Sequence, residues 1–160
     1  MTEPVHTAMA CAPDKPADAP AQDPPAGPRS GFVEHQVAGV AILLWSADPD
    51  SPHRLATPFF HAAAAAAMDI PVEIYFTAAS VRLLAQGLAA TIRPNASHQK
   101  TVLDSIREAT SFGVKLYACS DALAAYGLDE HALIDECSGR GGALQFMGRA
   151  ADLRWRTLVF

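Results

Sequence analysis

Apolar runs alternate with segments of helical periodicity from residue 37 to residue 160. Four of the runs are short, rich in β-branched or aromatic residues and bounded by turn formers, which is typical of strands. These predicted strands are Val37–Trp45, Val72–Phe76, Val114–Ala118 and Trp155–Phe160. A fifth strand could lie near Leu133–Cys137, although that segment fits a helix equally well.

The segments between these runs carry apolar residues at helical spacing. Pro52–Met68 combines a proline suited to a first helical turn with six consecutive alanines, the residues of highest helix propensity. The other predicted helices are Ser80–Leu88, His98–Phe112, Asp121–Tyr126, Asp129–Ile134 and Gly142–Ala151, and Thr91–Ser97 is a predicted loop. This alternation predicts a Rossmann-like or flavodoxin-like three-layer α/β sandwich with a mainly parallel sheet of four or five strands.

The first 30 residues differ in composition from the rest of the chain. They hold seven of the 12 prolines and almost no large apolar side chains. Ordering such a segment costs backbone entropy and buries little in return, which predicts a disordered tail (1–30) ahead of one domain (31–160). The tail lacks the basic start and apolar run of a secretory signal, and the nine residues of Val37–Trp45 are about half of what a bilayer helix needs. We therefore expect a soluble, cytoplasmic protein with no membrane partner.

Charge narrows the function classes further. The net charge of −5, from 12 basic and 17 acidic residues, argues against a nucleic-acid partner and against docking on anionic lipid. Charged residues make up 18% of the chain, below the average of roughly 25%. A surface poor in charge, together with an apolar final strand, predicts an oligomer. Three cysteines do not form a disulfide framework and indicate a reducing compartment.

Candidate chemistry gathers at the carboxyl ends of the predicted strands, where open α/β sheets bind ligands. Thr77 and Ser80 follow the second strand, and Cys119 and Ser120 follow the third. Only Cys119 is a strong nucleophile, and the N-terminus of the helix after it would stabilise a thiolate. A packing role fits the same residue, because free cysteines are commonly buried.

Other candidates carry less chemistry. Cys137 could be a resolving thiol or a packing residue, and Cys11 falls in the tail. The six histidines are scattered and no CxxC motif is present, so we expect neither a metal nor a cofactor. His53 could assist a thiolate, but an exposed polar residue at a helix start is ordinary. The glycine run Gly139–Gly142 lacks the ending of a Walker loop, although its amides could cradle an anion.

The run GVKLYACSDALAAYGLDEHALID, Gly113–Asp135, resembles the DsrE-like sulfur-relay family, in which a strand ending in YACS precedes a short helix and a Gly-Leu turn. The resemblance extends to Val72–Gly87, to Gly141–Ala151 and to the closing WRTLVF, and it covers about residues 37–160. It implies a compact Rossmann-like subunit that assembles into homotrimers or hexamers.

The resemblance also implies a function. In sulfur-relay members the cysteine at this strand end carries a persulfide and passes sulfane sulfur between proteins such as rhodanese-like and TusA-like carriers. This role falls on Cys119, which predicts a sulfur carrier or sulfurtransferase subunit. Thr77, Ser80 and Ser120 could donate hydrogen bonds to the persulfide, or simply cap their helices. Two alternatives stay open: a noncatalytic oligomeric or small-ligand-binding subunit, and a thiol peroxidase-like protein with Cys137 as the resolving residue.

Overall fold

The computed structural model describes residues 37–95, 97 and 99–160, and the predicted disordered tail lies outside them. The strands are β1 (Gly39–Leu44), β2 (Val72–Phe76), β3 (Lys115–Ala118), β4 (Gly139–Arg140) and β5 (Trp155–Val159). The α-helices are α1 (Ala56–Ala66), α2 (Leu88–Thr91), α3 (Val102–Ser111), α4 (Ser120–Ala125) and α5 (Ala143–Ala150). Three 3₁₀ helices join them: η1 (Pro52–Arg54), η2 (Ala78–Leu84) and η3 (Glu130–Ala132). None of the described helices combines the length and apolarity needed to cross a membrane.

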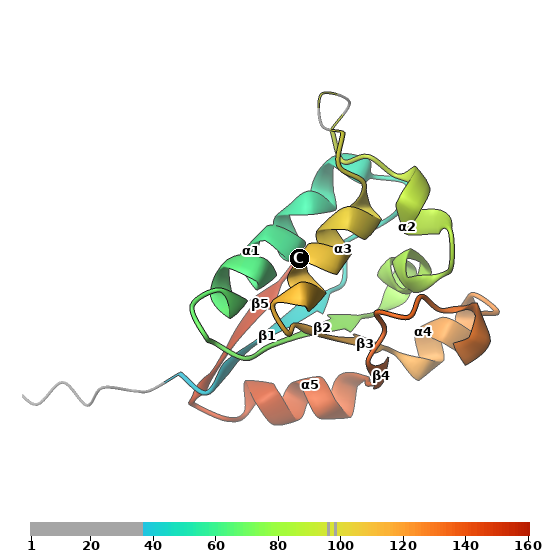
Figure 1. The fold of residues 1–160 in the computed structure, drawn as a ribbon. Coiled ribbons are helices and arrows are strands. Elements are labelled where there is room, and N and C mark those ends of the chain that lie inside the picture. The colour runs from blue at the N-terminus through green and yellow to red at the C-terminus, as the bar shows by residue number, and fades with distance from the viewer. Residues whose placement is uncertain (1–36, 96, 98) are drawn as a thin grey trace, which may run out of the picture. The chain divides into compact units, whose positions relative to one another are not determined.

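The strands form one parallel sheet in the order β4-β3-β2-β1-β5. The chain steps in one direction from β1 to β4 and then returns to the far edge beside β1. Because such crossovers are right-handed, the outward steps place their helices on one face and the return step places its helix on the other. Figure 1 shows α1 and α3 on one side of the sheet and α5 on the opposite side.

The predicted three-layer α/β sandwich is therefore confirmed. The order of the strands differs from the flavodoxin-like order, 2-1-3-4-5. In that order the chain reverses after its second strand, whereas here it reverses only at its last crossover. This late return leaves α5 as the helix that covers the second face of the sheet.

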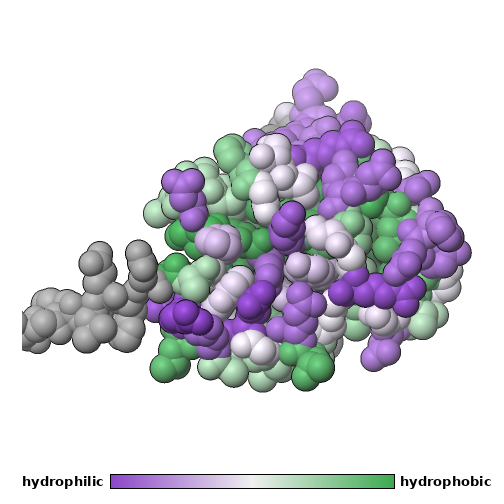
Figure 2. All heavy atoms as spheres, turned by 60° about the horizontal axis from the view of Figure 1, so that its bottom comes forward, coloured by the Kyte–Doolittle hydropathy of each residue, from purple (hydrophilic) through white to green (hydrophobic). Residues whose placement is uncertain are grey.

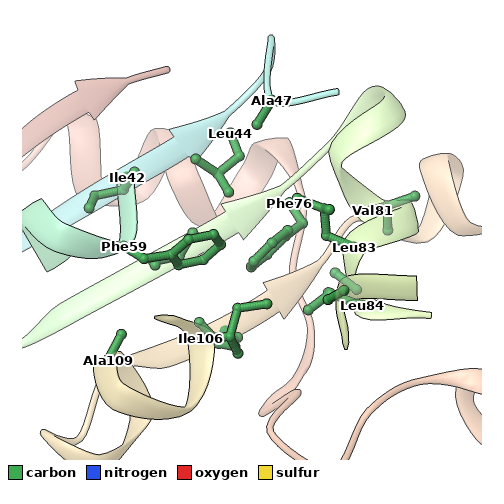
Figure 3. Packing of buried hydrophobic residues seen from close by; sticks show 14 of the residues in the cluster. Ile42, Leu44, Ala47, Phe59, Phe76, Val81, Leu83, Leu84, Ile106 and Ala109 are labelled. Carbon is green, nitrogen blue, oxygen red and sulfur yellow. The ribbon is translucent and has the colours of Figure 1, made fainter. Parts of the chain in front are cut away.

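The larger core lies between the sheet and the α1–α3 layer. Alternate side chains of β1 and β2 point into it, among them Ile42, Leu44 and Phe76. Phe59 of α1 stacks on Phe76 with ring centroids 6.2 Å apart. Ile106 of α3 completes this part of the cluster, as Figure 3 shows. Because every second side chain of a strand points to the same face of the sheet, VAILL in β1 and VEIYF in β2 each present a row of apolar side chains to this core.

The smaller core lies under α5. It contains Ala41, Tyr75 and Phe146, with Leu43 and Trp155 packed against it. Tyr75 forms an edge contact with Phe146, with ring centroids 5.6 Å apart. This second core fixes the position of α5, and hence the start of α5, over the carboxyl ends of the central strands.

Neither of the two alternatives left open for Leu133–Cys137, a strand or a helix, is formed over its length. Leu133–Cys137 forms no strand beyond an isolated bridge from Leu133 to Ala85, and the fifth strand is β4. β4 has two exposed residues at the sheet edge, so no apolar run marks it in the sequence. The short helix predicted at Asp129–Ile134 is reduced to the single turn η3.

Several helices also begin or end at residues other than the predicted ones. The predicted helix Pro52–Met68 is divided into η1 and α1, and the predicted helix Ser80–Leu88 is the 3₁₀ helix η2. α2 ends at Thr91, the first residue of the predicted loop Thr91–Ser97. α3 begins later than predicted because Thr101 caps it, accepting a hydrogen bond from the backbone N–H of Asp104 at 3.1 Å.

Candidate functional site

Cys119 lies between β3 and α4, at the carboxyl edge of the sheet. Its backbone N–H donates to the carbonyl of Phe76 at 2.9 Å, and its carbonyl accepts from Leu123 N–H at 2.9 Å. These two bonds tie the residue both to the neighbouring strand β2 and to the first turn of α4. The side chain is half-buried, and its thiol is free. A rigid backbone therefore presents one partly accessible sulfur atom at the strand end that the sequence pattern predicted.

A cavity of about 260 Å³ opens beside this thiol. Thr77, at the end of β2, and the glycines before α5 line it together with Cys119. The rest of the wall comes from β1, β2 and α5. Its members are Leu43, Tyr75, Phe76, Ala143, Phe146 and Met147. The cavity is thus an apolar recess between α5 and the central strands, with the sulfur atom on its surface.

Two glycines bring the start of α5 close to Cys119. A Cβ atom on Gly142 would lie 3.8 Å from the Sγ of Cys119, so a side chain at this position would touch the thiol. A Cβ atom on Gly141 would lie 2.9 Å from the Cβ of Tyr117, closer than side chains approach one another. These two glycines therefore permit close approach between the β4–α5 connection and the end of β3.

The other predicted site residues have different surroundings. Thr77 shares the cavity with Cys119. Ser80 is fully buried, and its hydroxyl lies 2.7 Å from the carbonyl of Thr77 and 2.8 Å from that of Leu44, while accepting from Thr77 N–H. Ser120 is exposed in the first turn of α4 and does not line the cavity. Of the three hydroxyls, the structure brings that of Thr77 to the cavity beside Cys119.

Cys137 lies outside this cavity. Its Sγ atom is half-buried, 3.6 Å from the carbonyl oxygen of Gly139 and 3.9 Å from that of Leu116. Burial raises the pKa of the Cys137 thiol and outweighs a backbone hydrogen bond with Gly139, which lowers it, while the charge of Glu130 adds a smaller increase. A higher pKa reduces the thiolate fraction, so Cys137 has the chemistry of a packing residue more than of a nucleophile. His53 is likewise absent from the cavity wall.

The pattern of the sequence did not indicate an ion pair beneath α5. Arg149 donates to both carboxylate oxygens of Glu73, each at 2.8 Å, and the Tyr75 hydroxyl donates to the same carboxylate at 2.6 Å. The guanidinium also lies over the ring of Trp155, 4.2 Å from its centroid. Glu73 is 8% exposed. The group therefore fastens α5, which forms one wall of the cavity, to the middle of the sheet.

The electrostatics of this group follow from its partners. Burial alone would raise the pKa of Glu73, but the hydrogen bonds from Arg149 and Tyr75 and the charge of Arg149 together lower it below the ordinary 4.5. The pKa of Tyr75 is raised by burial and by its hydrogen bond to the Glu73 carboxylate. The available signal was a lone acidic residue inside the apolar strand VEIYF, which requires a buried partner for its charge.

Metal-binding geometry is not found in the part of the chain that the structure describes. No group of three or more histidine, cysteine, aspartate or glutamate side chains there is placed to hold an ion.

Comparison with solved structures shows the same fold in proteins of distant sequence. The ychN protein of E. coli aligns with a TM-score of 0.61 at 14% identity, over 76% of this chain and 98% of that one. MTH1491 of Methanobacterium thermoautotrophicum, a protein of unknown function, gives a TM-score of 0.53 at 18% identity, over 76% and 97% of the two chains. BT1422 of Bacteroides thetaiotaomicron, also of unknown function, gives 0.55 at 16% identity, over 78% and 97%.

Comparison at the level of sequence identifies the family. No curated protein matches the chain. The family model for DsrE/DsrF-like proteins matches residues 39–153, which include β1, the Cys119 strand end and α5. Because this match spans most of the chain, the chain belongs to the DsrE/DsrF-like family.

Proposed function

We propose that this domain is a sulfur carrier subunit that relays sulfane sulfur as a persulfide on Cys119. The observation that carries the proposal is the half-buried Cys119 thiol, fixed at the strand end by two backbone hydrogen bonds and bordering a cavity. Family membership supports the same reading. A carrier needs an accessible thiol and a recess for the transferred sulfur, and Cys119 has both.

The transfer needs no external oxidant or reductant. In loading, the Cys119 thiolate attacks the terminal sulfur of a donor persulfide, R–S–SH. The S–S bond of the donor breaks, R–S⁻ leaves with the electron pair, and Cys119 becomes Cys119–S–SH. In discharge, an acceptor thiolate attacks the terminal sulfur in the same way and Cys119 leaves as the thiolate. The protein donors and acceptors in this proposal are of the rhodanese-like or TusA-like kind.

Loading at Cys119 is the first expected result. Incubation with a persulfide donor should add the mass of one sulfur atom to the intact protein, and Cys119→Ser should abolish the addition. Cys137→Ser is the matched control, because Cys137 lies outside the cavity and its pKa is raised. Intact-mass spectrometry under non-reducing conditions measures all three proteins. Equal loading of the wild type and Cys119→Ser would exclude the proposal.

The cavity also favours a second candidate, a noncatalytic subunit that binds a small ligand in an apolar recess. The two functions differ in the accessibility of Cys119. A neutral thiol reagent should label Cys119 in the native protein if it is a carrier, and only at the rate of unfolding if the residue is a packing cysteine. Peptide mapping after brief labelling distinguishes them.

We also propose that the subunits assemble into a homotrimer or hexamer. Large apolar side chains stay exposed on α5 and toward the sheet edge: Leu144 is 91% exposed, Leu153 85% and Val159 60%. Figure 2, which turns the α5 side forward, shows separate green patches among polar residues. Large contiguous apolar patches mark interaction sites, and an assembly that covers these side chains together would remove them from water.

The assembly is tested by light scattering over a range of concentrations. The wild type should have the mass of three or six subunits, and Leu144→Glu should shift the mass toward one subunit. Because Leu144 is exposed within the subunit, this change should leave the subunit folded. A wild-type mass of one subunit at every concentration would refute the assembly.

A further inference from the structure

The wall of the cavity beside Cys119 carries no charge. All ten residues around this recess, which lies wholly within the described part of the chain, are uncharged. The nearby charged residues Glu73 and Arg149 form an ion pair with each other beneath α5. Tyr75 lines the wall, but its hydroxyl donates to Glu73. Thr77 and Cys119 therefore supply the polar side-chain groups that a ligand would meet.

This wall discriminates among ligands by charge. A carboxylate or sulfonate that enters must lose part of its hydration shell and finds no cationic side chain among the wall residues, which is unfavourable. A neutral apolar group gains from the same wall, because leucine, phenylalanine and methionine side chains remove it from water. The uncharged wall thus disfavours small anionic thiols and favours neutral ones.

The volume sets the size of the ligand. An apolar cavity of roughly 150 Å³ is known to hold a benzene molecule. The recess of about 260 Å³ therefore accommodates a single ring with a short thiol-bearing arm. Its position against the Sγ atom would place the sulfur of such a ligand near that of Cys119.

We propose that the recess binds a neutral, apolar, low-molecular-weight thiol that accepts sulfane sulfur from Cys119. The proposal rests on the persulfide function argued above. The thiolate R–S⁻ attacks the terminal sulfur of Cys119–S–SH; a new S–S bond forms, the Cys119 S–S bond breaks, and the products are R–S–SH and the Cys119 thiolate. Atoms and charge balance, and nothing is oxidised or reduced overall.

A binding experiment tests the recess apart from the chemistry. Benzyl alcohol and 4-(hydroxymethyl)benzoate are titrated into Cys119→Ser by calorimetry. Benzyl alcohol should bind, and the benzoate should bind at least about tenfold more weakly because its carboxylate has no partner. Met147→Lys, which adds a cation at the cavity wall, should reverse this preference. Ala150→Lys adds the same charge at an exposed position of α5 outside the wall and should leave the preference unchanged.

A transfer experiment then tests the acceptor class. Wild-type protein loaded with persulfide is mixed with benzyl mercaptan or 4-(mercaptomethyl)benzoate, and loss of the extra sulfur is followed by mass. Each discharge rate is divided by the rate at which the same thiol reduces a small disulfide in solution, which corrects for differences in intrinsic reactivity. After this correction, the neutral thiol should discharge Cys119 about tenfold faster than the anionic thiol.

The outcomes separate the two proposals. Normal loading with equal discharge by both thiols would overturn the acceptor class and leave the carrier function standing. Failure to load would overturn the carrier function, and with it the acceptor. Absence of benzyl alcohol binding to Cys119→Ser, as when a second subunit or a protein partner fills the recess, would overturn the small-ligand site.

Discussion

Replacing Arg149 with methionine should lower the free energy of unfolding by about 2–3 kcal/mol at neutral pH. The change leaves the carboxylate of Glu73, 8% exposed, under α5 without its guanidinium partner. Removing one member of a fully buried pair costs somewhat more, but the Arg149 side chain is 38% exposed and solvent screens part of the interaction. Urea denaturation at fixed protein concentration measures the difference.

The same variant should show a distinctive pH dependence. In the wild type the pKa of Glu73 lies below the unfolded value near 4.5, so its stabilising contribution is present above that pH and lost as the pH falls through the lowered pKa. Without Arg149, burial outweighs the remaining hydrogen bond from Tyr75 and raises the pKa. The variant is then penalised as the pH rises through that value. Its deficit should therefore be large at pH 7 and shrink toward about pH 4.

Arg154→Met is the matched control. Arg154 pairs with Asp152 at 2.9 Å, but the arginine is 70% exposed and the pair lies at the surface. Such pairs contribute little, so this variant should unfold close to the wild type at every pH. A loss in Arg149→Met no larger than in Arg154→Met, or a deficit that widens in acid, would contradict the assigned role of the Glu73 group.

Phe59→Ala should lower the free energy of unfolding by about 3–5 kcal/mol. Phe59 is 1% exposed and stacks on Phe76 at 6.2 Å in the core between α1 and the sheet, so truncation leaves a cavity that its neighbours only partly fill. Phe60, the next residue of α1, is 47% exposed and provides the control. Phe60→Ala should cost less than about 1 kcal/mol, most of it the contact with Lys100. Similar losses for the two variants would show that the α1–sheet core is misassigned.

The elements of the structure that depend on a local sequence pattern could be predicted from the sequence. Val72–Phe76 and the strand before Cys119 are short apolar runs, so both strands and the position of the thiol at a strand end followed from periodicity. β4 did not, because its two exposed residues at the sheet edge need no apolar side chains. The strand order could not be predicted either, because the sequence of β4, α5 and β5 does not determine at which edge of the sheet β5 pairs.

The cavity depends on contacts between residues far apart in the chain. Arg149 and Glu73 are 76 positions apart, and their pairing holds the helix that forms one wall. No local window contains both residues. The glycines at 141 and 142 signalled an unusual backbone, but only the fold shows that they permit close approach to Tyr117 and Cys119. The position of Cys119 at a strand end was thus predictable from sequence, whereas the cavity beside it was not.

The central claim is that one thiol both receives and releases sulfur. The most direct measurement loads the protein with a persulfide donor, removes the donor, adds a thiol acceptor and records the intact mass at each stage. We predict a gain of one sulfur atom per subunit in the wild type and in Cys137→Ser, complete loss of it after the acceptor is added, and no gain in Cys119→Ser. A gain in Cys119→Ser equal to that of the wild type, or a sulfur on Cys119 that no thiol removes, would contradict the relay.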